Sequence, residues 1–223
     1  MCFSATACFT AAAILIPTGV YTLNKSCRGD KRYLALASFP LLFGIQQITE
    51  GALWLSFEQR AGFSIDMAAM GFLFFAYFLW PFFVPLAALL VETKTSRRTL
   101  FKGFTIIGFL FGASLYIPLL INQDWLSVTT VKGSILYEST LIYDGIIPRT
   151  TLRIVYAVIV AVPLLFSTVN SLRIFGALIF ISVTISAALF AYAFVSIWCF
   201  FAAILSAFVV YIIHHEAKHP PKS

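Results

Sequence analysis

Long apolar stretches dominate the chain, and short polar segments separate them. Each stretch has roughly the 20 apolar residues that a helix needs to cross the hydrocarbon core of a bilayer. We therefore predict about seven membrane-spanning helices, at Ser4–Leu23, Tyr33–Phe57, Met67–Val91, Gly103–Ile121, Pro148–Thr168, Ile174–Tyr192 and Ser196–Ile213. The last two form one apolar run that is about twice the core thickness in length, so we predict a turn near Tyr192–Ser196.

The composition also indicates a chain that is solvated by lipid. Of its 223 residues, 61% are hydrophobic and only 11% are charged. A soluble domain of this size keeps about 25% of its residues charged. We predict an all-α integral membrane bundle that forms a single transmembrane domain over residues 1–223, with the lipid bilayer as its partner. No nucleic acid is needed to explain the net charge of +6.

The cations lie mainly in alternate loops, which predicts the orientation of the chain. Eleven of the 15 Lys and Arg residues fall on one side of the predicted bundle: Lys25, Arg28, Lys31, Arg32, Lys94, Arg97, Arg98, Lys102, Arg173, Lys218 and Lys222. Cytoplasmic loops carry the excess of positive charge. We therefore predict an outside N-terminus, a cytoplasmic tail at residues 214–223, and a location in the cell membrane, expected to be a bacterial inner membrane.

The segment Asn122–Ile147 is the longest predicted loop, and it lies on the outer side. Its residues Val128–Val131 and Ile135–Tyr137 are β-branched or aromatic, and they flank a turn at Gly133. This pattern predicts a β-hairpin. Loops of this length often cover a site, so we consider two roles equally: a lid, and a cap that only closes the bundle.

Glu50 is an acidic residue deep inside a predicted membrane helix, and it is therefore a candidate functional residue. Gln46, Gln47, Glu50 and Trp54 recur at spacings of three and four residues, so they share one helical face. Polar faces within a membrane point into the bundle because lipid offers them no hydrogen-bond partner. We predict that these four residues bind a small ligand or an ion in the outer half of the membrane.

Other polar and aromatic residues are predicted at the same depth as Glu50. Arg153 and Trp198 are further candidate ligand-binding residues, since their helices enter from the outer side. Cys2, Glu50 and Cys199 would together offer thiolate and carboxylate groups, which suit zinc or copper. The spacing of these three residues in the sequence gives this metal site no independent support.

Several simpler interpretations of the same residues stay open. Cys8 and Cys199 are small enough to serve only in packing. Cys2 and Cys199 are also candidates for a disulfide on the oxidising outer side. Glu50 is a candidate partner for Arg153 in a structural ion pair, or for a hydrogen bond within its own helix.

Four motifs resemble those of a family of small bacterial multi-pass membrane proteins of unknown function. They are Met1–Ala7, Gln47-x-x-Glu50-Gly51-x-x-Trp54, Trp80-Pro81 and Ser196–Ala202. The resemblance extends over the whole chain and implies a multi-helix membrane protein. It implies no activity.

From the sequence we therefore expect an outward-facing intramembrane polar pocket that binds a metal ion or a small ligand. Two hypotheses from other classes stay open. The first is a proton-coupled small transporter that uses Glu50, and the second is a membrane-embedded enzyme that uses Cys199 with Glu50. The sequence is also compatible with a homo-oligomer.

Overall fold

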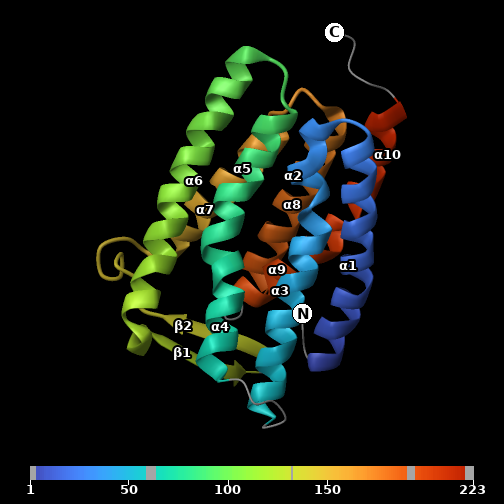
Figure 1. Cartoon of the computed structure of the whole chain (residues 1–223). Helices are drawn as coiled ribbons and strands as arrows, with labels where there is room; N and C mark the ends of the chain where they lie inside the picture. The colour runs from blue at the N-terminus through green and yellow to red at the C-terminus, as the bar shows by residue number, and fades with distance from the viewer. Residues whose placement is uncertain (1–3, 59–63, 132, 190–193, 219–223) are drawn as a thin grey trace.

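The structure is a computed structural model that describes residues 4–58, 64–131, 133–189 and 194–218. Helices make up almost all of these residues (Figure 1). The α-helices are α1 (Ala5–Arg28), α2 (Leu34–Ala37), α3 (Phe39–Phe57), α4 (Ile65–Leu73), α5 (Trp80–Val91), α6 (Thr95–Ile121), α7 (Arg149–Leu165), α8 (Asn170–Leu189), α9 (Phe194–Ser206) and α10 (Phe208–Lys218). Short helical turns are η1 (Lys31–Tyr33), the π-helix η2 (Phe74–Leu79) and η3 (Gln123–Trp125).

Consecutive helices join into longer rods that pack side by side (Figure 1). Helices α2 and α3 form one rod, α4, η2 and α5 form a second, and α9 and α10 form a third. The all-helical bundle that the sequence predicts is thus confirmed. The predicted turn near Tyr192–Ser196 lies largely outside the described residues, since α8 ends at Leu189 and α9 begins at Phe194.

Five helical segments of the described chain are long and apolar enough to cross a membrane: Ala5–Arg28, Ile65–Val91, Thr95–Ile121, Asn170–Ala188 and Phe194–His215. Large apolar side chains are exposed on several of them, including Ile14 (61% exposed) and Leu110 (61% exposed). Such surfaces favour lipid over water as the solvent. Helix α7 has only 17 residues, and α3 carries four buried polar side chains, so seven membrane spans stay a prediction.

Glycines bring pairs of helices into close contact. A Cβ atom at Gly19 of α1 would overlap the backbone of Leu41 in α3, and one at Gly108 of α6 would overlap the carbonyl of Pro81 in α5. Small residues at helix interfaces are typical of membrane bundles, where close backbone approach replaces the hydrophobic effect as the source of packing energy.

The two ends of the bundle differ in structure. Figure 1 shows the β-hairpin at the end where α3 finishes and α4 begins. The connections α1–α2, α5–α6 and α7–α8 lie at the opposite end, as does the end of α10. Because the basic residues gather in these connections, the fold collects most of the cations at the end away from the hairpin.

The hairpin fills the segment between α6 and α7. Strand β1 (Leu126–Val131) pairs antiparallel with β2 (Ser134–Ser139), with Val128 opposite Tyr137. Gly133 has a φ of 72°, a backbone conformation that glycine adopts without strain. The Tyr137 ring stacks on Phe72 of α4 with ring centroids 4.9 Å apart, so the hairpin is packed onto the helices.

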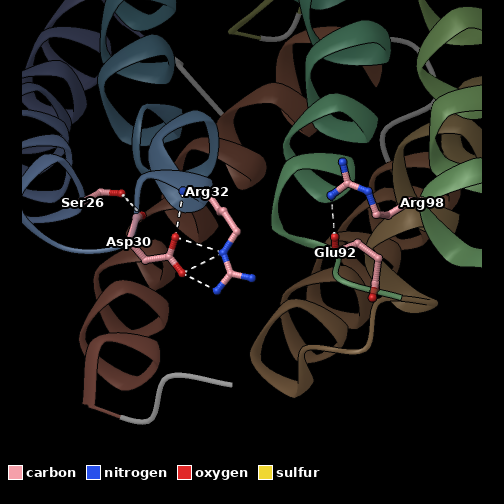
Figure 2. A network of polar contacts seen from close by, with 5 residues as sticks. All are labelled: Ser26, Asp30, Arg32, Glu92 and Arg98. Carbon is pink, nitrogen blue, oxygen red and sulfur yellow. Dashed lines mark hydrogen bonds and ion pairs between the residues drawn. The ribbon is translucent and has the colours of Figure 1, made fainter. Parts of the chain in front are cut away.

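At the opposite end, the buried carboxylate of Glu92 connects two turns of the chain. Thr168 donates to it through its backbone N–H (2.8 Å) and its hydroxyl (2.6 Å), and the backbone N–H of Lys94 donates at 3.0 Å. Arg98 also donates to the backbone carbonyl of Glu92 at 2.8 Å (Figure 2). The α5–α6 and α7–α8 turns are therefore joined through one side chain.

The first connection has a separate polar network, also drawn in Figure 2. Arg32 forms an ion pair with Asp30 at 2.6 Å, and Ser26 donates to the backbone carbonyl of Asp30 at 3.0 Å. The hydrogen bonds from Arg32 hold the pKa of Asp30 below its ordinary value, against a smaller opposing effect of burial. These contacts fix the direction in which the chain leaves α1.

We predict that Glu92→Gln destabilises the protein by about 1.5–3 kcal/mol, because an amide replaces a charged acceptor that has several donors. Thermal unfolding of the purified protein in detergent would measure the loss. Asp66→Asn is the matched control, since Asp66 is exposed in the first turn of α4. Equal unfolding temperatures for the wild type and Glu92→Gln would contradict the prediction.

The effect of Glu92→Gln should also depend on pH. Burial raises the pKa of the Glu92 carboxyl, but the hydrogen bonds from Thr168, Lys94 and Thr93 outweigh it, so the pKa lies below its ordinary value. The stabilisation is then present above the ordinary carboxyl pKa of about 4.3 and is lost as the pH falls through the lowered pKa. The difference in unfolding temperature between the two proteins should shrink over that range.

Candidate functional site

A cavity of about 500 Å³ lies between the β-hairpin and the helices α6, α7 and α9. Pockets of about 300–1,000 Å³ are the usual size for small-molecule sites. Residues from both strands, including Ser127 and Leu136, form one wall, and the helices form the other. The cavity thus lies where the helical bundle meets the β-hairpin.

Helix α7 supplies one face of the cavity. Arg149 is three and four residues before Leu152 and Arg153, and Tyr156 is four and three residues after them, which places all four on the same side of the helix. All four line the cavity. The charged residues come first along the chain, so the cavity is polar near the start of α7 and aromatic one turn deeper.

Helix α9 supplies the adjoining face, with Phe194, Trp198 and Cys199. The rings of Trp198 and Tyr156 meet edge to face, with centroids 4.9 Å apart. Trp198 is only 7% exposed, and its indole N–H has no acceptor among the described residues. Buried donors normally have a partner, so this donor indicates a place where a bound molecule would supply an acceptor.

The π-helix η2 positions a further part of the wall. Pro81 has no N–H, so it cannot donate to the carbonyl of Tyr77 four residues earlier, and the helix widens just before it. The Tyr156 hydroxyl donates to the carbonyl of Ala76 at 2.6 Å. The Tyr77 hydroxyl reaches Ser139 of the hairpin at 3.0 Å. The widened turn therefore connects α7 and the hairpin through two tyrosines.

Charged residues lie on both walls of the cavity. Arg149 donates to both carboxylate oxygens of Asp144, at 2.7 and 3.1 Å, and to the backbone carbonyl of Ser139 at 2.5 Å. The Arg153 guanidinium lies over the Phe194 ring, 5.0 Å from its centroid. Asp124 and Glu138 line the opposite wall, beside and within the hairpin.

Asp144 is a fixed counter-charge for Arg149. The hydrogen bond from the backbone N–H of Leu141 is the main cause of a pKa below the ordinary value for Asp144, and Arg149 lowers it further, while burial opposes both. The carboxylate is therefore ionised at neutral pH, and it holds Arg149 at the edge of the cavity.

The polar face predicted around Glu50 lies in the packing between helices and not in the cavity wall. Gln46, Gln47 and Glu50 are fully buried, and Trp54 is 9% exposed. The Ser196 hydroxyl donates to Glu50 at 2.5 Å. Gln46 accepts from the indole N–H of Trp80 at 2.8 Å. These bonds join α3 to α9 and α5.

Two of the predicted ligand-binding residues, Arg153 and Trp198, line the cavity, whereas Glu50, Gln46, Gln47 and Trp54 are not among the described residues that line it. Cys199, predicted as a metal ligand, is also in the cavity wall. Tyr77, Tyr156 and Arg149 also line the cavity, and the sequence alone did not indicate them as site residues. The spacing along α7 and the position of Tyr77 four residues before Pro81 were the available signals.

The predicted metal site receives no support from the described residues. Cys2 lies outside them. Among the described residues no group of three His, Cys, Asp or Glu side chains is placed to hold a metal ion. Cys8 and Cys199 are both buried in the apolar packing near the hairpin.

The described chain is thus a helical bundle in which five segments are long and apolar enough to cross a membrane, with a cavity beside its β-hairpin. The chain belongs to the family DUF6629, described as a family of unknown function, whose model matches residues 1–223. No curated protein and no solved structure matches the chain.

We predict that Ser196→Ala destabilises the protein by about 1–3 kcal/mol, because the buried Glu50 oxygen loses a donor from α9. Equilibrium unfolding in mixed micelles would measure the change. Ser206→Ala is the matched control on the same helix, since the buried Ser206 hydroxyl donates only to Ala203, at 2.6 Å, in its own helix. The prediction is wrong if the control variant is destabilised as much as Ser196→Ala.

Proposed function

We propose that the protein binds a small organic ligand in the cavity between the hairpin and helices α7 and α9. The observation that carries this proposal is the cavity itself, about 500 Å³ in volume, with charged and aromatic side chains in its walls. Empty cavities in proteins are usually apolar, whereas sites for ligands combine apolar walls with a few placed polar groups. Trp198 and Arg153 are such groups here.

The placement of the candidate residues favours binding over the two other hypotheses. An enzyme that used Cys199 with Glu50 would need both groups at the cavity, and Cys199 alone lines it. A transporter that used Glu50 as its proton-coupling group would need that carboxylate beside the ligand. Glu50 instead accepts from Ser196 within the packing of α3 against α9.

We also propose that the cavity faces the outside of the cell membrane. Seven helical spans would put the N-terminus and the hairpin outside and the tail in the cytoplasm. The concentration of cations at the opposite end of the bundle supports this orientation, because positively charged loops stay in the cytoplasm. The hairpin would then cover the cavity on the outer side, as a lid.

The orientation predicts how Cys27 reacts. Cys27 is exposed near the end of α1, at the basic end of the bundle, whereas Cys8 and Cys199 are buried. In a Cys2→Ala background, a membrane-impermeant maleimide should leave Cys27 unlabelled in intact cells and label it after the membrane is opened. Labelling of Cys27 in intact cells would reverse the proposed orientation.

Filling the cavity should abolish ligand binding. Leu152 lines the cavity and is 8% exposed, so Leu152→Trp would occupy space that the ligand needs. Native mass spectrometry of gently purified protein should detect a bound small molecule in the wild type. We expect the bound fraction to fall at least about tenfold in Leu152→Trp, which is a loss of about 1.4 kcal/mol in binding free energy.

Val158→Trp is the matched control for this experiment, because Val158 lies on the same helix but is 44% exposed on its outer surface. This variant should retain the bound molecule. Wild-type protein with no bound small molecule, or a molecule equally retained in Leu152→Trp, would contradict the proposed function.

A further inference from the structure

A second cavity of about 30 Å³ adjoins the cavity beside the hairpin, and we call it the inner cavity. Residues from α3, α5, α7, α8 and α9 surround it, and all of them are buried. Tyr156, Trp198 and Cys199 line both cavities. These three residues therefore form the boundary between two neighbouring spaces.

One stripe of residues on α7 passes both cavities. Val160 and Leu164 line the inner cavity, and they lie four and eight residues after Tyr156, so they continue its face of the helix. Helix α7 runs from the hairpin toward the α7–α8 connection at the opposite end of the bundle (Figure 1). Leu164 lies about 12 Å beyond Tyr156 in that direction. The inner cavity is therefore deeper in the bundle than the cavity beside the hairpin.

The chemistry of the walls changes with depth. Charged side chains of α7 line the cavity beside the hairpin, whereas none of the described residues that line the inner cavity is charged. The Tyr156 hydroxyl and the Trp80 indole N–H, which belong to the inner wall, donate to other protein groups at 2.6 and 2.8 Å. Val160 and Leu164 complete this wall with aliphatic groups. The two cavities together suit a molecule with one polar end and one apolar end.

Trp198 is the residue of the boundary that can turn at low cost. Its ring meets the Tyr156 ring edge to face, with centroids 4.9 Å apart. Tyr156 is fixed by its hydrogen bond to Ala76, but the Trp198 indole N–H has no acceptor among the described residues. Turning the Trp198 ring therefore breaks no hydrogen bond of that N–H. A turned ring would open a passage into the inner cavity.

We propose that the ligand is a small amphiphile, and this inference rests on the proposed function. Its polar end lies in the cavity beside the hairpin, and its apolar chain passes Trp198 and ends in the inner cavity. The inner cavity has room for about two water-sized groups, so the chain extends about two carbon atoms beyond the boundary. Because buried residues surround the inner cavity, it favours a short-chain molecule over a membrane phospholipid.

The test measures binding of straight-chain probes to the full-length protein in nanodiscs by isothermal titration calorimetry. The probes are 1-alkanols, alkanoates and alkylammonium ions, each with chains of about three to ten carbon atoms. Nanodiscs that hold Leu152→Trp are titrated in parallel, and subtracting their signal removes uptake by the lipid. In at least one series, the affinity should rise about fourfold with each methylene group and then fall beyond an optimal length.

Two variants change the size of the inner cavity in opposite directions. Ala202 and Val160 line the inner cavity, and neither is among the described residues that line the cavity beside the hairpin. Ala202→Leu fills space, so the optimal chain should become about two carbon atoms shorter, and the optimal wild-type probe should bind about tenfold more weakly. Val160→Ala creates space, so the optimal chain should become longer by about one or two carbon atoms.

Ala187→Leu is the matched control, because it makes the same change at an exposed position of α8. It should leave the optimal length unchanged. A variant that only disturbed the fold would weaken binding at every length, and it would not lengthen the optimum. The inference is overturned if no series has an optimum, or if Ala202→Leu or Val160→Ala fails to move the optimum in the stated direction.

Native mass spectrometry identifies the source of the ligand and separates this inference from the proposed function. A short-chain molecule that is bound to the wild type and lost in Ala202→Leu would support the inference, and a bound phospholipid would overturn it. A molecule without an apolar chain, retained in Ala202→Leu but lost in Leu152→Trp, would overturn the ligand class alone. Wild-type protein with no bound molecule and no probe binding would overturn both proposals.

Discussion

Hydrocarbon offers no hydrogen bonds, so each polar group within the bundle needs a partner from the protein itself. The described structure meets much of this constraint with bonds between helices, although the buried Trp198 N–H has no acceptor among the described residues. Gln46 accepts from Trp80, Glu50 accepts from Ser196, and Tyr156 donates to a carbonyl that the π-helix presents. Each bond joins two different helical segments, through residues that are 34 to 146 positions apart in the sequence. The polar residues therefore specify which helices are neighbours, while the apolar residues mainly specify that they are helices.

The same constraint explains why the two ends of the bundle are built differently. At the basic end, the Glu92 carboxylate accepts hydrogen bonds from two turns and so holds these turns against the helix ends. At the other end, a β-hairpin covers the helices and leaves a cavity beneath it. Backbone that is not helical satisfies its own hydrogen bonds in the hairpin, so a cover of this type is stable next to the membrane. The cavity lies where the hairpin meets the π-helix and the helices α6, α7 and α9.

The cavity and the buried polar bonds between helices are separate in this arrangement. Glu50 and the two glutamines lie in the helix packing, whereas Arg153, Trp198 and the tyrosines surround the open space. Ser196 and Trp198 are two residues apart on α9, so the same helix connects the buried carboxylate to the cavity wall. A ligand-binding site with its walls held by buried polar bonds is pre-organised, which lowers the entropy lost when a ligand binds.

The sequence by itself determined that the chain forms long apolar helices of membrane-spanning length, because the apolar stretches are long and charges are few. It also predicted the hairpin around Gly133, since β-branched residues on both sides of a glycine turn favour a hairpin through local interactions.

The sequence did not identify the cavity. Three separate elements contribute Tyr77, Tyr156 and Ser139 to this region. The periodicity of residues within one helix cannot predict contacts between different elements. Glu50 was prominent in the sequence because a buried charge is rare in lipid, but only the packing of α9 against α3 decided that its partner is Ser196. The local sequence pattern determines whether each segment forms a helix or a strand. The contacts between segments determine where a site forms, because they depend on side-chain shape and on hydrogen bonds across the bundle.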